Sequence, residues 1–454
     1  MEVFTIVSTQ IEKRLDPHFY RPKYLGFEEN IKERDFHLID DISKVICGPF
    51  GSAILVSDYQ NEGVPLIRIS NINQNGELIF MDVTYISEEL ASGLSNYRVS
   101  EGDIIISQRG TLGLNAIVKS DFNNAIISAN FIAIKELNSM KPKFLKYFLD
   151  TETAKIQLER RISGQVQIKL TTEDIKSIKV PKIDKNKQNQ LIQIMDAAYS
   201  RKKHNEEEAE KLLNFYSEMV NEFIDIDLSV STQRKIFTIR FNELEGAINP
   251  ERYANRISLD GNHSWIQIND IGDVIRETFM PSRVNAENKY GLIRIDDLEN
   301  NPQDAEIRNV QGKEINGIIL KVQENDILIA RLGPTLENKK TIIAPNYNIE
   351  LIASNEFICL RCRENFNPIF VLIFLKTDFY KNLMIQKSRG AIPSRRRLSH
   401  EDFAELPFPD IDKTIQDEIV NKFIANIVKA KYLKKEAIET LEKAKEEIEK
   451  ILFE

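Results

Sequence analysis

Two long segments of the chain repeat apolar residues at alternating steps of four and three. The first follows positions 191, 195, 198, 202, 205, 209, 212, 216, 219 and 223, with Lys202 and Asn205 as its polar interruptions. The second follows positions 420, 423, 427, 430, 434, 437, 441, 444, 448 and 451, with Lys434 as its polar interruption. This spacing is typical of a heptad seam and predicts two long amphipathic helices. The span 191–223 would be about 50 Å long at 1.5 Å per residue. Each helix could lie on its own domain, but their equivalent places favour pairing as a coiled coil.

Shorter apolar runs precede each long helix. The strings GDIIIS, AIISANFIAI, NDILIA and EFICLRC contain clustered β-branched residues between turn residues, which predicts strands. These strands fall in two regions, about 38–181 and 263–409. A short helix is expected at the end of each region, near Lys143–Arg161 and near Pro368–Lys387.

The two halves of the chain repeat one another. The tetrapeptide LIRI occurs at Leu66–Ile69 and again at Leu292–Ile295, an offset of 226. GDIIISQRG and NDILIARLG, ANFIAI and NEFICL, and FLDT and FLKT follow in the same order at offsets of 223 to 226. Gln188 and Gln416 then open the two long helical patterns. An ordered series with a drifting offset indicates a duplicated domain with insertions and deletions in its loops.

Bulk composition excludes several classes of protein. The 454 residues are 42% hydrophobic and 29% charged, with a net charge of −8, so the chain is not coated in positive charge. No apolar run approaches the ~20 residues of a membrane span. The start of the sequence has no basic leader followed by an apolar core, so no signal peptide is expected. Cys47, Cys359 and Cys362 fit a reducing compartment, and we expect a cytoplasmic protein with no membrane contact.

Motifs for catalysis and metal binding are incomplete. GPTLENKKT, from Gly333, has Asn338 where a phosphate-binding loop requires its second glycine. NPIF, from Asn367, lacks the second proline of the amino-methyltransferase loop. Cys359 and Cys362 have no second cysteine pair to complete a zinc site, and strand alternation should send them to opposite faces. We therefore expect no catalytic residue, no metal site and no cofactor bound by this chain.

Basic stretches occupy equivalent places in the two halves. QKSRGAIPSRRRLSH holds five cations and no acidic residue, and its counterpart in the first half mixes cations with amides. Arg and Lys neutralise phosphates, and Arg and Gln can also read base edges. An exposed basic loop that binds nothing is the alternative, but equivalent placement favours a ligand surface. The candidate DNA-binding residues are Arg389, Arg395, Arg396 and Arg397, then Gln165, Gln167 and Lys169, then Arg109 with Thr111 in a loop after a strand.

The order of these elements resembles the specificity subunit of type I restriction–modification systems. The resemblance runs from Leu15 to Phe453 and rests on GVPLIRISNI, GDIIISQRGTLG and SGQVQIKLTTEDIKSIKVP, with their partners in the second half. The usual Glu-Gln before the long helix stands as IQDEIV in the second half and KQNQLIQI in the first.

The resemblance implies an α+β fold without catalytic activity. Two similar mixed strand/helix target-recognition domains would be joined by two long helices that pair as an antiparallel coiled coil, with pseudo-twofold symmetry. The expected parts are an N-terminal segment 1–37, recognition domain 38–187, central conserved long helix and linker 188–247, recognition domain 248–411, and C-terminal conserved long helix 412–454.

Partners also follow from the resemblance. The chain would bind double-stranded DNA at a bipartite target and dock two modification subunits, which bring S-adenosylmethionine. A restriction translocase–nuclease subunit, which uses ATP and Mg²⁺, can join them. Three alternatives remain open: a targeting subunit of another multi-subunit phage-defence methylation complex, a coiled-coil adaptor without a DNA role, and an unrecognised nuclease.

The duplication also bears on Arg68 and Arg294, which are identical in the two LIRI strands. A split target usually has two different halves, so residues that discriminate bases should differ between copies. We therefore interpret these arginines as framework or, at most, phosphate contacts, and expect specificity where the copies diverge.

Overall fold

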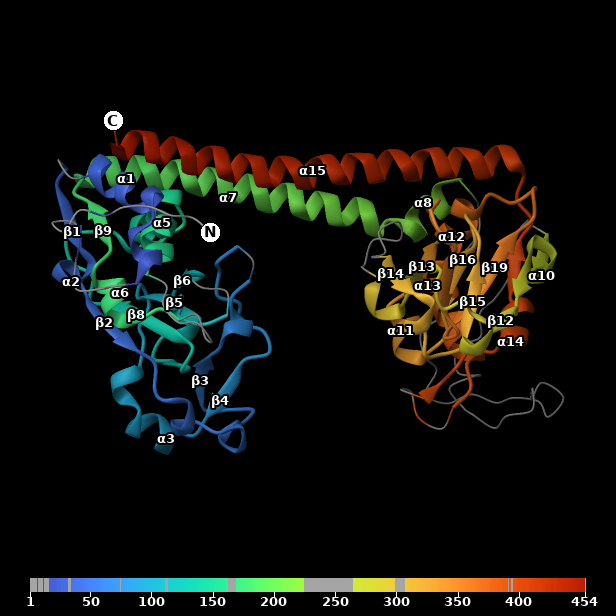
Figure 1. Cartoon of the computed structure of the whole chain (residues 1–454), viewed down its shortest axis with the longest axis horizontal. Coiled ribbons are helices and arrows are strands. Elements are labelled where there is room, and N and C mark those ends of the chain that lie inside the picture. The colour runs from blue at the N-terminus through green and yellow to red at the C-terminus, as the bar shows by residue number, and fades with distance from the viewer. Residues whose placement is uncertain are drawn as a thin grey trace. The chain divides into compact units, whose positions relative to one another are not determined.

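The computed structural model describes residues 6, 11, 16–31, 34–73, 75–110, 113–161, 169–223, 264–298, 307–390, 392 and 395–453. The chain forms two compact units. Unit 1 comprises residues 1–205 and 435–454, and unit 2 comprises residues 206–434. Each unit therefore contains a part of both long helices. Figure 1 colours the chain from its N-terminus to its C-terminus.

Unit 1 contains a long helix, short helices and small sheets. Its helices are α1 (Pro22–Ile31), α2 (Ile39–Ile42), α3 (Glu88–Gly93), α4 (Pro142–Leu149), α5 (Glu152–Arg161), α6 (Thr172–Lys176) and most of α7 (Lys185–Asn214). Its strands are β1 (Phe36–Leu38), β2 (Lys44–Cys47), β3 (Val64–Ile67), β4 (Thr84–Ile86), β5 (Ile104–Ser107), β6 (Asn115–Ile117), β7 (Ile126–Ile127), β8 (Phe131–Lys135) and β9 (Lys179–Pro181).

Unit 2 repeats this plan with a larger second sheet. Its helices are α8 (Tyr216–Phe223), α10 (Ile268–Ile271), α11 (Gly333–Glu337), α12 (Pro368–Leu375), α13 (Asp378–Lys387), α14 (His400–Ala404) and the first part of α15 (Lys413–Phe453). Its strands are β10 (Trp265–Gln267), β11 (Gly272–Ile275), β12 (Thr278–Phe279), β13 (Lys289–Ile293), β14 (Arg308–Gln311), β15 (Ile319–Val322), β16 (Ile327–Ala330), β17 (Thr341–Ile343), β18 (Leu351–Ser354), β19 (Phe357–Cys362) and β20 (Pro407–Pro409).

The sheets of the two units match in order. Antiparallel strands run β2–β8–β5–β6 in unit 1 and β11–β19–β16–β17 in unit 2. The second sheet runs β4–β3–β7 in unit 1, and the same parallel and antiparallel pairings recur in β14–β13–β18 of unit 2. The predicted strands are thus confirmed, and the repeat in the sequence is a repeat in topology.

The predicted short helix before each long helix is in fact two helices. α4 ends at Leu149 and α5 begins at Glu152, and α12 and α13 are divided in the same way at Thr377. The Thr377 hydroxyl accepts a hydrogen bond from Tyr380 N, and Thr151 does the same for Ala154 N. Each threonine therefore caps a new helix, which explains the break that the apolar pattern did not reveal.

The central helix is also interrupted. One helix was predicted across 191–223, but α7 ends at Asn214 and α8 starts at Tyr216, with Phe215 between them. Tyr216, Met219 and Val220 are buried in the same hydrophobic cluster as α12. The break follows from this packing, because α8 is directed onto α12, which Figure 1 places beside it.

The heptad positions are largely buried inside each unit. In unit 1, Leu191, Met195 and Ala198 of α7 share a core with Leu441, Ala444 and Ile448 of α15. In unit 2, Ala209 packs with Ala430 and Leu433. Position 434 was predicted to be in the seam, but Lys434 is exposed and Leu433 is buried in its place. In the described part of the chain, no helix is both long and apolar enough to cross a membrane.

Candidate nucleic-acid interface

The predicted basic segment of unit 2 forms a loop between α13 and α14. Arg389 and Arg397 face each other through two backbone hydrogen bonds of 2.9 Å. Gly390 makes the closure possible, because a Cβ atom there would lie 2.7 Å from Arg395 O and 2.8 Å from the Arg396 backbone. Leu398 is fully buried and anchors the end of the loop in the core.

This loop is fastened to the end of strand β16. Leu398 N donates to Arg331 O at 2.9 Å, and Gly333 N donates to Arg396 O at 2.9 Å. Unit 1 has the matching contact, in which Leu170 N donates to Gln108 O at 3.1 Å just after β5. Lys169 and Arg109 therefore belong to two segments that lie side by side. The sequence does not indicate that these two residues are neighbours. Both side chains are exposed, and neither forms an ion pair within the described residues.

The four arginines of the unit 2 loop have different surroundings. Arg389 pairs with Asp402 at 2.9 Å, and Arg397 pairs with Glu356 at 2.9 Å. Arg396 is half-buried, whereas Arg395 is exposed and without an ion pair in the part of the chain that the structure describes. Thr111, Gln165 and Gln167 lie outside the described residues. Arg395 is thus the arginine best placed to meet a phosphate.

Arg389 forms an ion pair that stabilises the fold and that the sequence does not predict. Its partner Asp402 has a side chain only 9% exposed, and Ser399 Oγ donates to that carboxylate at 2.6 Å. Ser399 in turn caps α14 by accepting from Asp402 N at 2.9 Å. The guanidinium of Arg389 therefore neutralises a carboxylate that is almost removed from water.

His400, the first residue of α14, lies at the base of this loop. Burial lowers the pKa of the His400 imidazole, and the nearby guanidiniums of Arg331 and Arg276 lower the pKa further. Arg331 Nε is buried without a hydrogen-bond partner, and so is Glu356 Oε2. His400 is consequently neutral at physiological pH.

The repeated arginines of the LIRI strands have local partners. The guanidinium of Arg68 lies 5.4 Å from the ring centre of Tyr59, and its backbone N–H donates to Asn71 Oδ1 at 2.9 Å. Arg294 pairs with Asp296 at 3.6 Å. These contacts agree with the interpretation of both residues as framework.

The cysteines and acidic residues do not assemble a metal site in the described ranges, where no group of three or more His, Cys, Asp or Glu side chains could hold an ion. Cys359 packs in one hydrophobic cluster and Cys362 against another, as strand alternation predicted. Burial raises the pKa of the Cys362 thiol to about 12, so this thiol stays protonated and unreactive.

Comparison with known proteins finds a family that the first half of the chain is similar to. The family model described as the type I restriction modification DNA specificity domain matches residues 33–238. These residues therefore resemble a domain of this family. The type I restriction enzyme EcoBI specificity subunit of Escherichia coli is 24% identical over 143 residues. That alignment covers 32% of this chain and 30% of the relative, so it spans about a third of either length.

A solved structure extends the likeness to most of the chain. It comes from work on complex assembly and conformational transition of the type I R-M system. The superposition has a TM-score of 0.50 at 16% sequence identity and covers 90% of this chain and 96% of the other. At that identity the likeness establishes a shared fold.

Proposed function

We propose that this chain is the DNA-specificity subunit of a type I restriction–modification system. It reads a bipartite target in double-stranded DNA, directs a methyltransferase to that target, and catalyses no reaction itself. The match over residues 33–238 supports this role for the first half. We assign the same role to the second half because unit 2 repeats the sheet order of unit 1.

One observation carries the proposal: the two units hold a cation-bearing loop at the same place in the same fold. Leu170 is bonded to the end of β5 as Leu398 is bonded to the end of β16. Exposed cations stand beside both anchors, Arg109 and Lys169 in unit 1 and Arg395 in unit 2. A chain with two such surfaces suits a target read as two separate half-sites.

Phosphates and bases would be contacted by different side chains. Arg109, Lys169, Arg395, Arg396 and Arg397 carry the charge that neutralises phosphates and sets the register on the duplex. Thr111, Gln165 and Gln167 supply hydroxyl and amide groups, which suit base edges. Arg389 takes part as a support of the loop, because its guanidinium is paired with Asp402.

The long helices would pair as an antiparallel coiled coil that sets the gap between half-sites, with the recognition domains at 38–187 and 248–411. Arg201 pairs with Glu436 in unit 1 and Glu208 pairs with Lys429 in unit 2, so residue numbers rise on α7 as they fall on α15. In unit 1 the seam residue Asn205 donates to Glu436 at 3.2 Å, which satisfies a buried amide and favours one register. Pseudo-twofold symmetry follows from the repeated domain.

Modification subunits would dock on these helices. Ile424, Val428 and Tyr432 of α15 form an apolar stripe at steps of four residues, and they are 41%, 63% and 63% exposed. Such a stripe on a highly charged helix suits a protein partner. Two modification subunits would bring S-adenosylmethionine, and restriction subunits using ATP and Mg²⁺ can be added. The complex would work in the cytoplasm, where its cysteines stay reduced.

Co-expression of this chain with its modification partner tests the proposal. Methylated bases mapped across the genome should reveal a split motif with a fixed gap. Exchanging residues 38–181 for those of another specificity subunit should change one half of the motif and leave the other half intact. Removing one turn from α7 should alter the gap or abolish assembly.

The opposite outcomes define the alternatives. No methylation, or a continuous short motif, would contradict the specificity-subunit role. Unchanged DNA binding after neutralisation of Arg109, Lys169 and Arg395 would favour an adaptor without a DNA role. Metal-dependent cleavage by the purified chain would favour a nuclease, and neighbouring genes would separate a restriction system from another methylation complex.

A further inference from the structure

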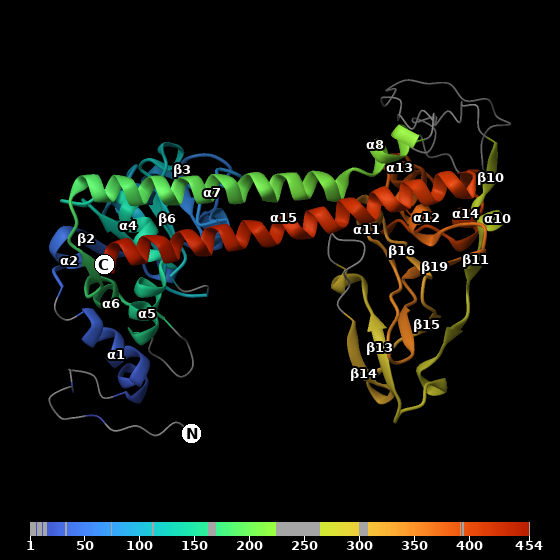
Figure 2. The same ribbon diagram turned by 90° about the horizontal axis from the view of Figure 1, so that it is seen from above.

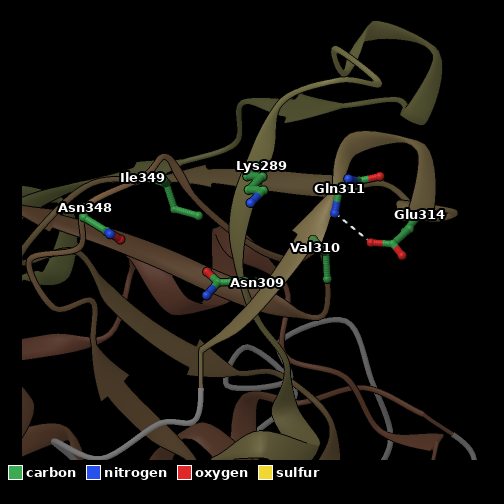
Figure 3. Close-up of a pocket in the computed structure, with 7 residues that line it drawn as sticks. All are labelled: Lys289, Asn309, Val310, Gln311, Glu314, Asn348 and Ile349. Atoms are coloured by element: carbon green, nitrogen blue, oxygen red, sulfur yellow. Dashed lines mark hydrogen bonds between the residues drawn. The ribbon is translucent and has the colours of Figure 1, made fainter.

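A polar pocket of about 310 Å³ opens on the β13–β14 ribbon of unit 2. Figure 3 shows its lining, which includes an ammonium group, a carboxylate and three carboxamides. They belong to Lys289, Glu314, Asn309, Gln311 and Asn348. In Figure 2 this ribbon lies at the end of unit 2 that is away from α15. None of these residues was singled out from the sequence.

The ribbon aligns three of these side chains on one face. β13 and β14 are antiparallel, with Lys289 opposite Gln311 and Gly291 opposite Asn309. Residues directly opposite each other, and residues two apart along a strand, point to the same face. The intervening Tyr290 and Val310 pack instead with Ile315, Ile319 and Ile352 in a hydrophobic cluster. Because one face of the two strands packs on this cluster, the side chains of Lys289, Asn309 and Gln311 point to the opposite face.

Asn309 is held in one orientation. Tyr347 Oη donates to Asn309 Oδ1 at 3.1 Å, which leaves the amide nitrogen of Asn309 as an outward donor. The tyrosine ring reaches this position across Gly291, where a Cβ atom would lie 2.9 Å from the ring carbons Cδ1 and Cε1. A glycine opposite Asn309 thus makes room for the side chain that orients it.

The pocket's charge argues against a phosphate ligand. Lys289 and Glu314 cancel formally, and Glu314 is fixed beside the amides because its carboxylate accepts from Gln311 N at 2.7 Å. The side-chain amides of Gln311 and Asn348 and the Lys289 ammonium make no hydrogen bond within the described ranges. A neutral site rich in donors and acceptors matches a base edge, since Asn and Gln bond adenine and Lys bonds guanine in the major groove.

The matching face of unit 1 is chemically different. Leu66 is paired with Thr84 as Leu292 is paired with Arg308, and Pro65 is paired with Tyr85 as Gly291 is paired with Asn309. The same register puts Gly63 at the place of Lys289 and Ser87 at the place of Gln311. The ribbon has thus diverged in its polar residues while the adjoining LIRI framework stayed identical. Divergence of this kind is required of residues that read two different half-sites.

We infer that the β13–β14 ribbon enters the major groove of duplex DNA and that Asn309, Gln311 and Lys289 read base edges in the half-site of unit 2. β13 and β14 lie at one edge of a five-stranded sheet, and their end at Lys289 and Gln311 extends beyond the part of β13 that pairs with β18. Two projecting strands fit a groove about 12 Å wide. Tyr347 acts as a positioning residue, because it fixes the amide of Asn309 without facing the base. The inference rests on the proposed function and assigns the discriminating contacts to this ribbon.

The test uses the full chain assembled with its methyltransferase. The probe is the duplex that the wild-type complex methylates, together with duplexes that carry single base substitutions in each half-site. Asn309→Ala with Gln311→Ala should reduce discrimination about 10- to 100-fold at one or two positions of a single half-site. Discrimination in the other half-site should be unchanged.

Two further variants, with one control, distinguish the reading of bases from a loss of folding and from a general loss of positive charge. Tyr347→Phe keeps the ring over Gly291 but loses the hydroxyl, so it should weaken discrimination at the base pair affected by Asn309→Ala. Lys289→Ala should also change the base preference, whereas Lys313→Ala removes the same charge from an exposed residue outside the pocket lining and should not.

The outcomes distinguish this inference from the proposed function. If the wild-type complex methylates a split motif and every ribbon variant keeps that motif and its discrimination, the ribbon does not read bases and the inference is overturned. If the wild-type complex yields no split motif, the proposed function itself fails. Thermal melting and gel filtration of each complex verify that the variants fold and assemble.

Discussion

The side chain of Gln188 accepts a hydrogen bond of 2.9 Å from the backbone N–H of Lys141, the residue that caps α4. Unit 2 repeats the relationship, since Gln416 accepts a hydrogen bond of 2.9 Å from Asn367 N at the cap of α12. Both glutamines are 1% exposed, and each also donates to a carbonyl just before its own long helix. One buried amide thus joins the start of a long helix to its domain.

Gln188→Ala should destabilise unit 1 by about 1–3 kcal/mol, because Lys141 N and Ile183 O would lose their buried partner. Urea unfolding monitored by circular dichroism measures the change. Gln190→Ala, at an exposed position two residues further along α7, is the matched control and should be neutral. Equal effects of the two substitutions would contradict this role for the amide.

Lys376 should make the stability of unit 2 depend on pH. Burial, aided by Lys339 and Lys340, lowers the pKa of its ammonium group from an ordinary value of 10.5 to about 7. Between these pH values the unfolded chain binds more protons than the folded one, so the free energy of unfolding should rise with pH across this window. Below pH 7 Lys376 is protonated in both the folded and the unfolded chain, so its unfavourable contribution to the free energy of unfolding no longer changes with pH.

Lys376→Met should therefore stabilise the protein at pH 7 by a few kcal/mol at most, since each pKa unit is worth about 1.4 kcal/mol. The advantage should shrink as the pH approaches 10.5. Thermal melts at several pH values measure it, with Lys434→Met as the control at an exposed lysine. A variant that is less stable than wild type at pH 7 would show that the ammonium makes a favourable contact.

Arg395 should act on DNA affinity alone. Arg395→Ala removes an exposed charge and should weaken binding of the assembled complex to all duplexes, lowering the slope of log affinity against log salt by about one. Arg389→Ala should instead destabilise unit 2, because the nearly buried carboxylate of Asp402 would lose this ion pair. Fluorescence anisotropy across a salt series measures DNA affinity, and urea unfolding measures stability. If both variants changed affinity and stability to the same extent, the separate roles of Arg395 and Arg389 would be refuted.

Val428→Lys should weaken docking of the modification subunit and leave the fold of the chain intact. The Val428 side chain is 63% exposed, so the substitution buries no charge in the free chain, but it would in a complex that covers the apolar stripe. Pull-down with the methyltransferase measures the loss. Lys434→Glu, at another exposed position of α15, is the control, and unaltered docking of Val428→Lys would exclude this face as the contact.

Local and periodic features were predictable from the sequence. Strands β5 and β16 are predicted by clusters of β-branched residues between turn residues, and the seam residues Leu191 and Ala430 are predicted by a repeat of three to four residues. Breaks such as Phe215 were not, because the helical pattern continues through them and the tertiary contacts of α8 decide the direction. The regular spacing likewise predicts Lys434 as a seam residue, whereas the neighbouring Leu433 is the one that is buried.

The candidate site shows a similar division. Exposed cations such as Arg395 are visible in a sequence as a cluster, but the ion pair that engages Arg389 spans 13 residues and depends on the fold. The ribbon pocket was missed because Lys289 and Gln311 are neighbours only across a sheet. No local signal in the sequence relates Tyr347 to Asn309, whose contact depends on the missing side chain of Gly291.

The core of unit 1 includes residues from the far end of the sequence. Leu441, Ala444, Ile448 and Leu452 of α15 pack in the same cluster as Ile104, Phe144 and Leu191. During synthesis, the first unit therefore stays incomplete until residue 452 has emerged from the ribosome, 267 residues after α7 begins at Lys185. A nascent chain must keep this apolar surface from aggregating throughout that interval, and a chain released early exposes it to proteases. The core of unit 1 thus draws on segments that lie on both sides of unit 2 in the sequence, so a chain that stops before Leu441 lacks the α15 part of that core.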